Sequence, residues 1–360
     1  MHPDVPPRAA SGSLPNLDAM RALAVLLVLA SHVMTCLESF GLYHFDPLDR
    51  QLGRLGVLLF FVHTCFVLTA SLDRAGLADV PLLRTFYIRR AFRIYPLALL
   101  CIALTLLLQI PPAPWQAHET PSIGAVLSNL ALTMNLTATT PLSGPMWTLP
   151  IEVQMYLALP FVFLLTKRAR DPGRLAALFV VAMALGWLLP KISGRLYGAQ
   201  FGPCFLAGVI AYAWYRHVAA RFPGKSWVML LAVLVPAYLG AEALVPGLHP
   251  IALQYVTCLL VGLVLPLFRQ SGASVFNRLT RAVARYSYGI YLFHLIAMWV
   301  GLFWLRPASP FAGWLTALLV LVVLAVGGYH LVEAPAIRLA VRLTGQRRAA
   351  AGGALDSPPP

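Results

Sequence analysis

The sequence has 360 residues, of which 59% are hydrophobic and 11% charged, and its mean hydropathy is +0.75. Soluble domains carry about 25% charged residues, so this composition excludes an ordinary soluble protein and predicts an all-α polytopic membrane protein. The formal charge of +14 does not indicate nucleic-acid binding, because the basic residues lie between apolar runs. Five scattered cysteines lack Cys-x-x-Cys spacing, so neither a metal site nor a disulfide framework is predicted.

The apolar runs predict about ten membrane-spanning helices in one membrane domain, residues 16–343. A polar segment, 1–15, precedes it without a cleavable signal, and a disordered tail, 344–360, follows. The weaker run 123–136 is shorter than a crossing needs and is predicted to be an interfacial or re-entrant helix; if it crosses, the count is eleven. The predicted spans are 17–37, 53–72, 94–110, 149–166, 174–190, 201–215, 227–244, 251–268, 286–305 and 312–335.

The distribution of basic residues predicts that both termini are cytoplasmic. With the N-terminus inside, 22 of the 27 Lys and Arg residues fall in inner segments. The five that fall outside are Arg50, Arg54, Lys191, Arg195 and Arg306. An odd number of crossings would place later basic clusters on the wrong side, so this asymmetry favours an even number.

The first apolar run is interrupted by two ionisable residues, Arg21 and His32. Eleven residues separate them, and at about 100° per residue the net rotation is about 20°, so both side chains leave one face of a helix. They lie roughly 16 Å apart along its axis. An ionisable group inside a membrane span is expensive and marks a candidate functional site. The alternative is that Arg21 extends to the headgroups and His32 is a packing residue.

Arginines also cluster where the third span begins. Arg89, Arg90 and Arg93 converge on the cytoplasmic end of a helix, and Pro96 follows just inside. Such clusters often anchor a helix to lipid headgroups. Their planar guanidinium groups equally suit a bidentate grip on phosphates, which is the functional alternative.

Further polar residues lie at membrane depth in other spans. His63 lies near the middle of the second span. Glu152 opens the fourth span, where it complements the helix dipole or orients a sugar hydroxyl or a histidine. The ninth span places His294 near the midplane, with Ser287 and Tyr291 on neighbouring turns.

Two other groups have structural and functional interpretations. Trp147 and Tyr156, on either side of Glu152, fit an aromatic belt at the membrane interface. In the last span, His330 and Glu333 have a spacing of three and are predicted to share one helix face near the cytoplasmic arginines.

Together these stretches resemble the membrane-bound acyltransferase 3 family, whose members move acyl groups onto sugars and other hydroxyl-bearing acceptors. A weaker match to the closing Glu-x-Pro lies at Glu333 to Pro335. The five stronger matches are Leu17-Asp-x-x-Arg21 with its spacing to His32, Gly56-Val-x-Leu-Phe-Phe, Arg89-Arg-x-x-Arg93-x-x-Pro96, Trp147-Thr-Leu-x-x-Glu152-x-x-x-Tyr156, and Ser287-Tyr-x-Ile-Tyr-Leu-x-His294.

The resemblance implies an O-acyltransferase of the bacterial inner membrane that uses acyl-CoA, expected to be acetyl-CoA, as a donor and holds no permanent cofactor. Arg21, Arg89, Arg90 and Arg93 would hold the donor phosphates at the inner face. His32 would act as general base or carry the acyl group itself. Glu152 and His294 would fix its tautomer or meet the acceptor. The acceptor is expected to be a carbohydrate or lipid-linked glycan at the outer face, contacted by Trp147, Tyr156 and Tyr291.

The sequence also departs from the family pattern. After Phe60-Phe61 the family commonly has Leu-Ser-Gly, whereas this chain has His63-Thr64-Cys65. Some relatives carry a fused hydrolase-like domain; a stand-alone membrane enzyme is expected here. The rival interpretation is a transporter or proton-coupled permease, because intramembrane His, Arg and Glu residues also mark ion and proton pathways.

Overall fold

The structure is a computed structural model that describes residues 14–44, 47–245, 247–272, 274–306 and 309–345. The predicted N-terminal segment and C-terminal tail lie outside the described residues, apart from 14–15 and 344–345. Across the described ranges the protein is helical, without a named strand, which confirms the all-α prediction. Helices satisfy their own backbone hydrogen bonds, as a chain inside hydrocarbon must.

The first half of the chain begins with three long helices, α1 (Pro15–Ser39), α2 (Pro47–Ala75) and α3 (Asp79–Leu107). The short helices α4 (Ile123–Ala131) and α5 (Met134–Thr137) follow, then the 3-10 turn η1 (Gly144–Trp147) and α6 (Thr148–Leu165). α7 (Pro172–Ile192), the 3-10 segment η2 (Gly194–Phe201) and α8 (Gly202–Tyr215) complete this half.

The second half contains α9 (Ser226–Leu239), α10 (Ala241–Leu244), α11 (Pro250–Val264) and the 3-10 turn η3 (Leu265–Leu267). α12 (Val275–Met298) runs into the π-helical turn η4 (Trp299–Trp304). α13 (Pro310–Gly328) runs through a second π-helical turn, η5 (Tyr329–Glu333), into α14 (Ala334–Leu343).

Nine helices in the described residues are long and apolar enough to cross a membrane, and they coincide with nine of the ten predicted spans. The predicted span 227–244 differs, because it is divided at Gly240 into α9 and α10. The 14 residues of α9 reach about 21 Å at 1.5 Å per residue, less than a hydrocarbon core of about 30 Å. Within 123–136 the structure has only the short helices α4 and α5, so no continuous spanning helix forms there.

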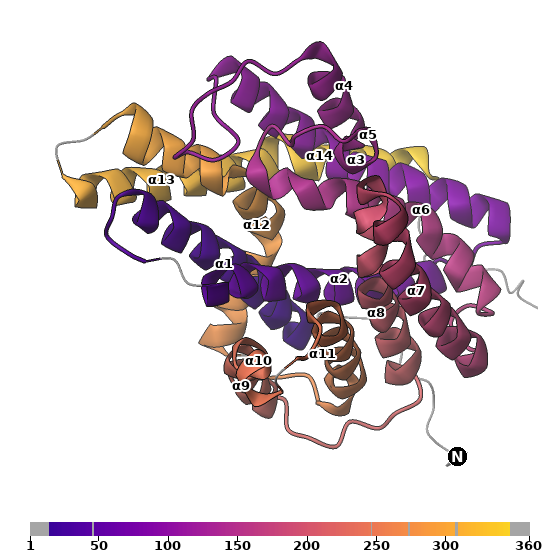
Figure 1. Ribbon diagram of the computed structural model, residues 1–360. Coiled ribbons are helices and arrows are strands. Elements are labelled where there is room, and N and C mark those ends of the chain that lie inside the picture. Colours follow the sequence, from indigo (N-terminus) through magenta and orange to yellow (C-terminus); the bar gives the residue numbers. More distant parts are fainter. Residues whose placement is uncertain (1–13, 45–46, 246, 273, 307–308, 346–360) are drawn as a thin grey trace, which may run out of the picture.

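α2 lies at the centre of the bundle and is the most buried of the nine long helices, whereas α7 is the least buried. α1 packs against α2 and α12, and α2 packs against α8. In Figure 1, α1 and α2 cross the middle of the view, with α4 and α5 above them and α9 to α11 below. The chain therefore surrounds α2 with helices drawn from both halves of the sequence.

The contact between α1 and α2 depends on a glycine. A Cβ atom placed on Gly56 would lie 2.5 Å from the Ala24 carbonyl oxygen and 2.9 Å from Cγ2 of Val28. Small residues at helix crossings let backbones approach closely inside a membrane. Gly56, predicted only as part of a motif, thus sets the distance between the two helices.

Candidate active site

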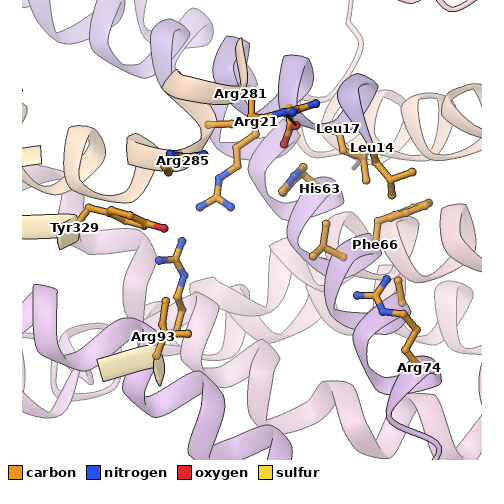
Figure 2. Close-up of a pocket in the computed structure, with 15 residues that line it drawn as sticks. Leu14, Leu17, Arg21, His63, Phe66, Arg74, Arg93, Arg281, Arg285 and Tyr329 are labelled. Atoms are coloured by element: carbon orange, nitrogen blue, oxygen red, sulfur yellow. Dashed lines mark ion pairs between the residues drawn. The ribbon is translucent and has the colours of Figure 1, made fainter. Parts of the chain in front are cut away.

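The candidate site begins at one end of the bundle, where α2 ends and where α3 and α12 begin. We call this the arginine-rich end. A cavity of about 420 Å³, the wide cavity, opens there. Figure 2 shows the guanidinium groups of Arg21 and Arg93 pointing into it from opposite walls. Five arginines and one aspartate line this cavity: Arg21, Arg74, Arg93, Arg281, Arg285 and Asp18.

Two narrower cavities continue from the wide one. The neck, about 70 Å³, shares Arg21, His63, Val67 and Arg93 with the wide cavity. The tip cavity, about 60 Å³, shares Arg21, Thr64, Glu152 and Tyr288 with the neck, and Tyr291 also lines it. The three cavities thus form a series that narrows from the arginine-rich end toward the middle of the bundle.

Arg21 and His32 leave one face of α1, as predicted, and both reach α12. Nε of Arg21 donates to Oγ of Ser287 at 2.6 Å. The imidazole rings of His32 and His294 lie 4.8 Å apart, centroid to centroid. The predicted face of α12 is therefore present, with Ser287 and His294 two turns apart along it.

The two histidines have the same tautomer. Nδ1 of His32 lies 2.9 Å from the Val28 carbonyl oxygen, and Nδ1 of His294 lies 2.8 Å from that of Tyr291. A carbonyl oxygen only accepts, so each Nδ1 carries the proton and each Nε2 keeps its lone pair. The backbone, and not Glu152, fixes the tautomer of His32, which corrects one of the two roles expected for that carboxylate.

His294 is 1% exposed, and its Nε2 has no hydrogen-bond partner among the described residues. His32 is half-buried. The Tyr291 ring lies 6.3 Å from that of His294 and also lines the tip cavity. Tyr291 donates to the Pro145 carbonyl oxygen at 2.7 Å, which holds its ring between the cavity and the histidine pair.

Glu152 lies in the wall shared by the neck and the tip cavity and accepts a hydrogen bond from the Tyr156 hydroxyl. It also interacts electrostatically with Arg21, Arg90 and Arg93. A carboxylate beside several guanidinium groups offsets their mutual repulsion where water is scarce. Its position makes Glu152 an organiser of the arginines.

Glu333 is the second carboxylate that holds a site arginine. It is 1% exposed and forms an ion pair with Arg93, whose guanidinium also lies 5.6 Å from the centre of the Tyr288 ring. The predicted shared face for His330 and Glu333 is wrong, because η5 is a π-helical turn. His330 is exposed and lies 3.2 Å from the Tyr286 hydroxyl, whereas Glu333 points inward.

Two predicted site residues lie apart from the cavities. Arg89 donates from Nε to the Thr344 hydroxyl at 3.1 Å and does not line the wide cavity. Trp147 packs against Phe201 in η2, with ring centroids 5.8 Å apart. Arg90 lines the neck but not the wide cavity.

Three arginines that line the wide cavity were not predicted as site residues: Arg74, Arg281 and Arg285. Helix packing brings them to Arg21, and no spacing along the chain links α2 to α12. One available signal was the spacing of four between Arg281 and Arg285, which places both on one face of α12.

Comparisons with known proteins show the family of the chain. The chain matches the family described as acyltransferase domain over residues 14–330. It is 26% identical to Nodulation protein 10 of Rhizobium leguminosarum bv. viciae, over 94% of this chain and 97% of that protein. It is 26% identical to the putative acetyltransferase ORF330 of Acidianus two-tailed virus, over 78% and 82% respectively.

A third relative is matched over a smaller share of its own length. The chain is 27% identical to the O-acetyltransferase OatA of Staphylococcus aureus, over 61% of this chain and 38% of that protein. No solved structure matches the chain.

Proposed function

We propose a reaction for this chain, which belongs to the acyltransferase-domain family and is a multi-pass membrane O-acyltransferase. It transfers an acetyl group from acetyl-CoA, bound at the arginine-rich end, to a hydroxyl of a carbohydrate or lipid-linked glycan. We place the arginine-rich end in the cytoplasm and the acceptor at the outer face of a bacterial inner membrane. The choice of acetyl rests on relatives named as acetyltransferases.

The observation that carries this proposal is the series of cavities. Five arginines line the wide cavity, and planar guanidinium groups suit the several phosphates of a coenzyme A donor. A volume of about 420 Å³ lies within the range of ligand sites. The neck and tip cavity suit only a slender chain, such as the pantetheine arm that carries the thioester.

In this proposal His32 is the general base. Its Nε2 takes the proton of the acceptor hydroxyl while the hydroxyl oxygen attacks the thioester carbonyl carbon. The carbon–sulfur bond then breaks, the acyl group stays on the acceptor oxygen, and CoA leaves as the thiolate that takes up a proton. His294 positions the His32 ring, and Tyr291 and Tyr156 line the path of the donor. A step through acyl-His32 has the same overall balance.

The same arrangement supports a proposed direction of transfer. α1 begins at the arginine-rich end, and His32 lies about 16 Å beyond Arg21 along its axis. The chain between α3 and α6, which includes α4 and α5, follows the opposite end of α3. We therefore propose that the donor enters from the cytoplasm and that the acceptor meets the thioester from the outer side.

Right-side-out membrane vesicles test this proposal. Vesicles containing the protein are loaded with radiolabelled acetyl-CoA, and label is measured in glycans released from their outer surface. We expect label there when acetyl-CoA is inside, and none when it is supplied only outside. Label confined to molecules within the vesicle would show that transfer across the membrane is wrong.

A further inference from the structure

His63 occupies the junction between the wide cavity and the neck. It projects from α2, lines both cavities, and is 5% exposed. Figure 2 shows its ring on the α2 wall, across the cavity from Arg93. The family commonly has a leucine at this position, so the family pattern predicts no polar role for it.

One nitrogen of the His63 ring is left without a partner in the part of the chain that the structure describes. Nδ1 is buried and has no hydrogen-bond partner among the described residues. Leaving a buried polar atom without a hydrogen bond is costly, and nearly all such atoms in native proteins find a partner. The two other histidines of the site bond to backbone carbonyl oxygens through Nδ1, which His63 does not. A partner from a bound molecule would relieve this cost.

The surroundings define the chemistry of that partner. Arg21 lines the same two cavities, so a positive charge on His63 would be repelled where water is scarce. A neutral imidazole has one donor and one acceptor, as an amide group has. The arginines line the wide cavity, whereas His63 lies where the cavity narrows.

We propose that His63 hydrogen-bonds an amide group of the pantetheine arm of acyl-CoA as the arm leaves the arginine-lined cavity. This inference rests on the proposed donor. His63 is a positioning residue, since it fixes how far the arm extends toward the histidine pair and does not touch the reacting atoms.

Binding of two probes to the purified protein tests the inference. Coenzyme A has both the phosphates and the arm, whereas adenosine 3′,5′-bisphosphate has phosphates without the arm. His63→Leu replaces the imidazole with an apolar side chain of similar size, and we expect it to raise the Kd for coenzyme A about tenfold, the effect of one lost hydrogen bond. The Kd for adenosine 3′,5′-bisphosphate should change less than twofold.

Two further variants complete the design. His63→Gln keeps a donor and an acceptor and should recover part of the coenzyme A affinity. Gly327→Ala in α13 is the control outside the three cavities, because an added Cβ there meets nothing within 4 Å, and coenzyme A affinity should change less than twofold. Thermal unfolding of each variant without ligand checks that it is folded.

The outcomes are separable. Unchanged coenzyme A affinity in folded His63→Leu would overturn the inference, and so would an equal loss for both probes, because His63 would then act on the phosphates. If the unsubstituted protein binds neither probe, the proposed donor itself is wrong.

Discussion

Substituting Gly56 by alanine tests whether the distance between α1 and α2 sets the geometry of the active site. The added Cβ would lie 2.5 Å from the Ala24 carbonyl oxygen, whereas ordinary contact begins at 3.4 Å, so the helices must separate by about 0.9 Å. Because the opposing atom belongs to the backbone, no side-chain rotation relieves the clash.

The displacement has two measurable costs. Overpacking in a tight interface costs about 1–3 kcal/mol of unfolding free energy. The Cβ would also lie 2.9 Å from Cγ2 of Val28, and the Val28 carbonyl oxygen holds Nδ1 of His32. A misplacement of about 1 Å at a reacting group can cost about a hundredfold in rate, so we expect Gly56→Ala to lower transfer by that order.

The assay combines thermal unfolding in detergent with label transfer in vesicles. Gly327→Ala in α13 is the matched control, because a Cβ there meets nothing within 4 Å. It should keep full activity and raise stability by up to about 1 kcal/mol through helix propensity. Wild-type stability and transfer in Gly56→Ala would refute the argument that this contact positions His32.

Three further experiments give distinct expectations. His32→Ala should lower transfer at least a hundredfold, the order expected for a lost general base, while the thermal midpoint of the purified protein holds; normal transfer would remove His32 from the chemistry. Arg285→Ala should raise the KM for acetyl-CoA several-fold and Arg89→Ala should not, because Arg285 lines the wide cavity and Arg89 does not. Equal effects of the two substitutions on KM would contradict the assignment of the wide cavity as the donor site. A cysteine at Leu42, which is 68% exposed, should react with an impermeant maleimide in intact cells, whereas one at Lys225 should be protected; the reverse pattern would invert the topology.

Hydrophobic length and periodicity predicted most of the fold, because they act locally. Nine of the predicted spans are long helices, and the shared face of Arg21 and His32 followed from helical rotation alone. The division at Gly240 was missed, since the apolar run continues through it and only the structure shows that the helix ends. α9 is too short to cross the membrane as one continuous helix, so the cytoplasmic position of both termini, which rests on an even number of crossings, stays a prediction.

The site was predicted only in part, because its members come from helices far apart in the chain. Arg21 and Arg93 were selected and line the wide cavity together with Arg285, whose approach depends on the packing of α12 against α1. Arg89 was selected from the same cluster as Arg93, yet it points toward Thr344. The sequence indicates that arginines gather at this end, whereas packing decides which of them face the cavity.

The ion pair between Arg93 and Glu333 has a consequence for biosynthesis. Arg93 enters the membrane early, with α3, but its carboxylate partner is made only when the ribosome has nearly finished the chain. Until then Glu152 on α6 and lipid phosphates are the counter-charges available to the guanidinium. The wide cavity also lacks the wall supplied by Tyr329 and Ile337 until that moment. A nascent chain therefore cannot complete the wide cavity before its last helix is inserted.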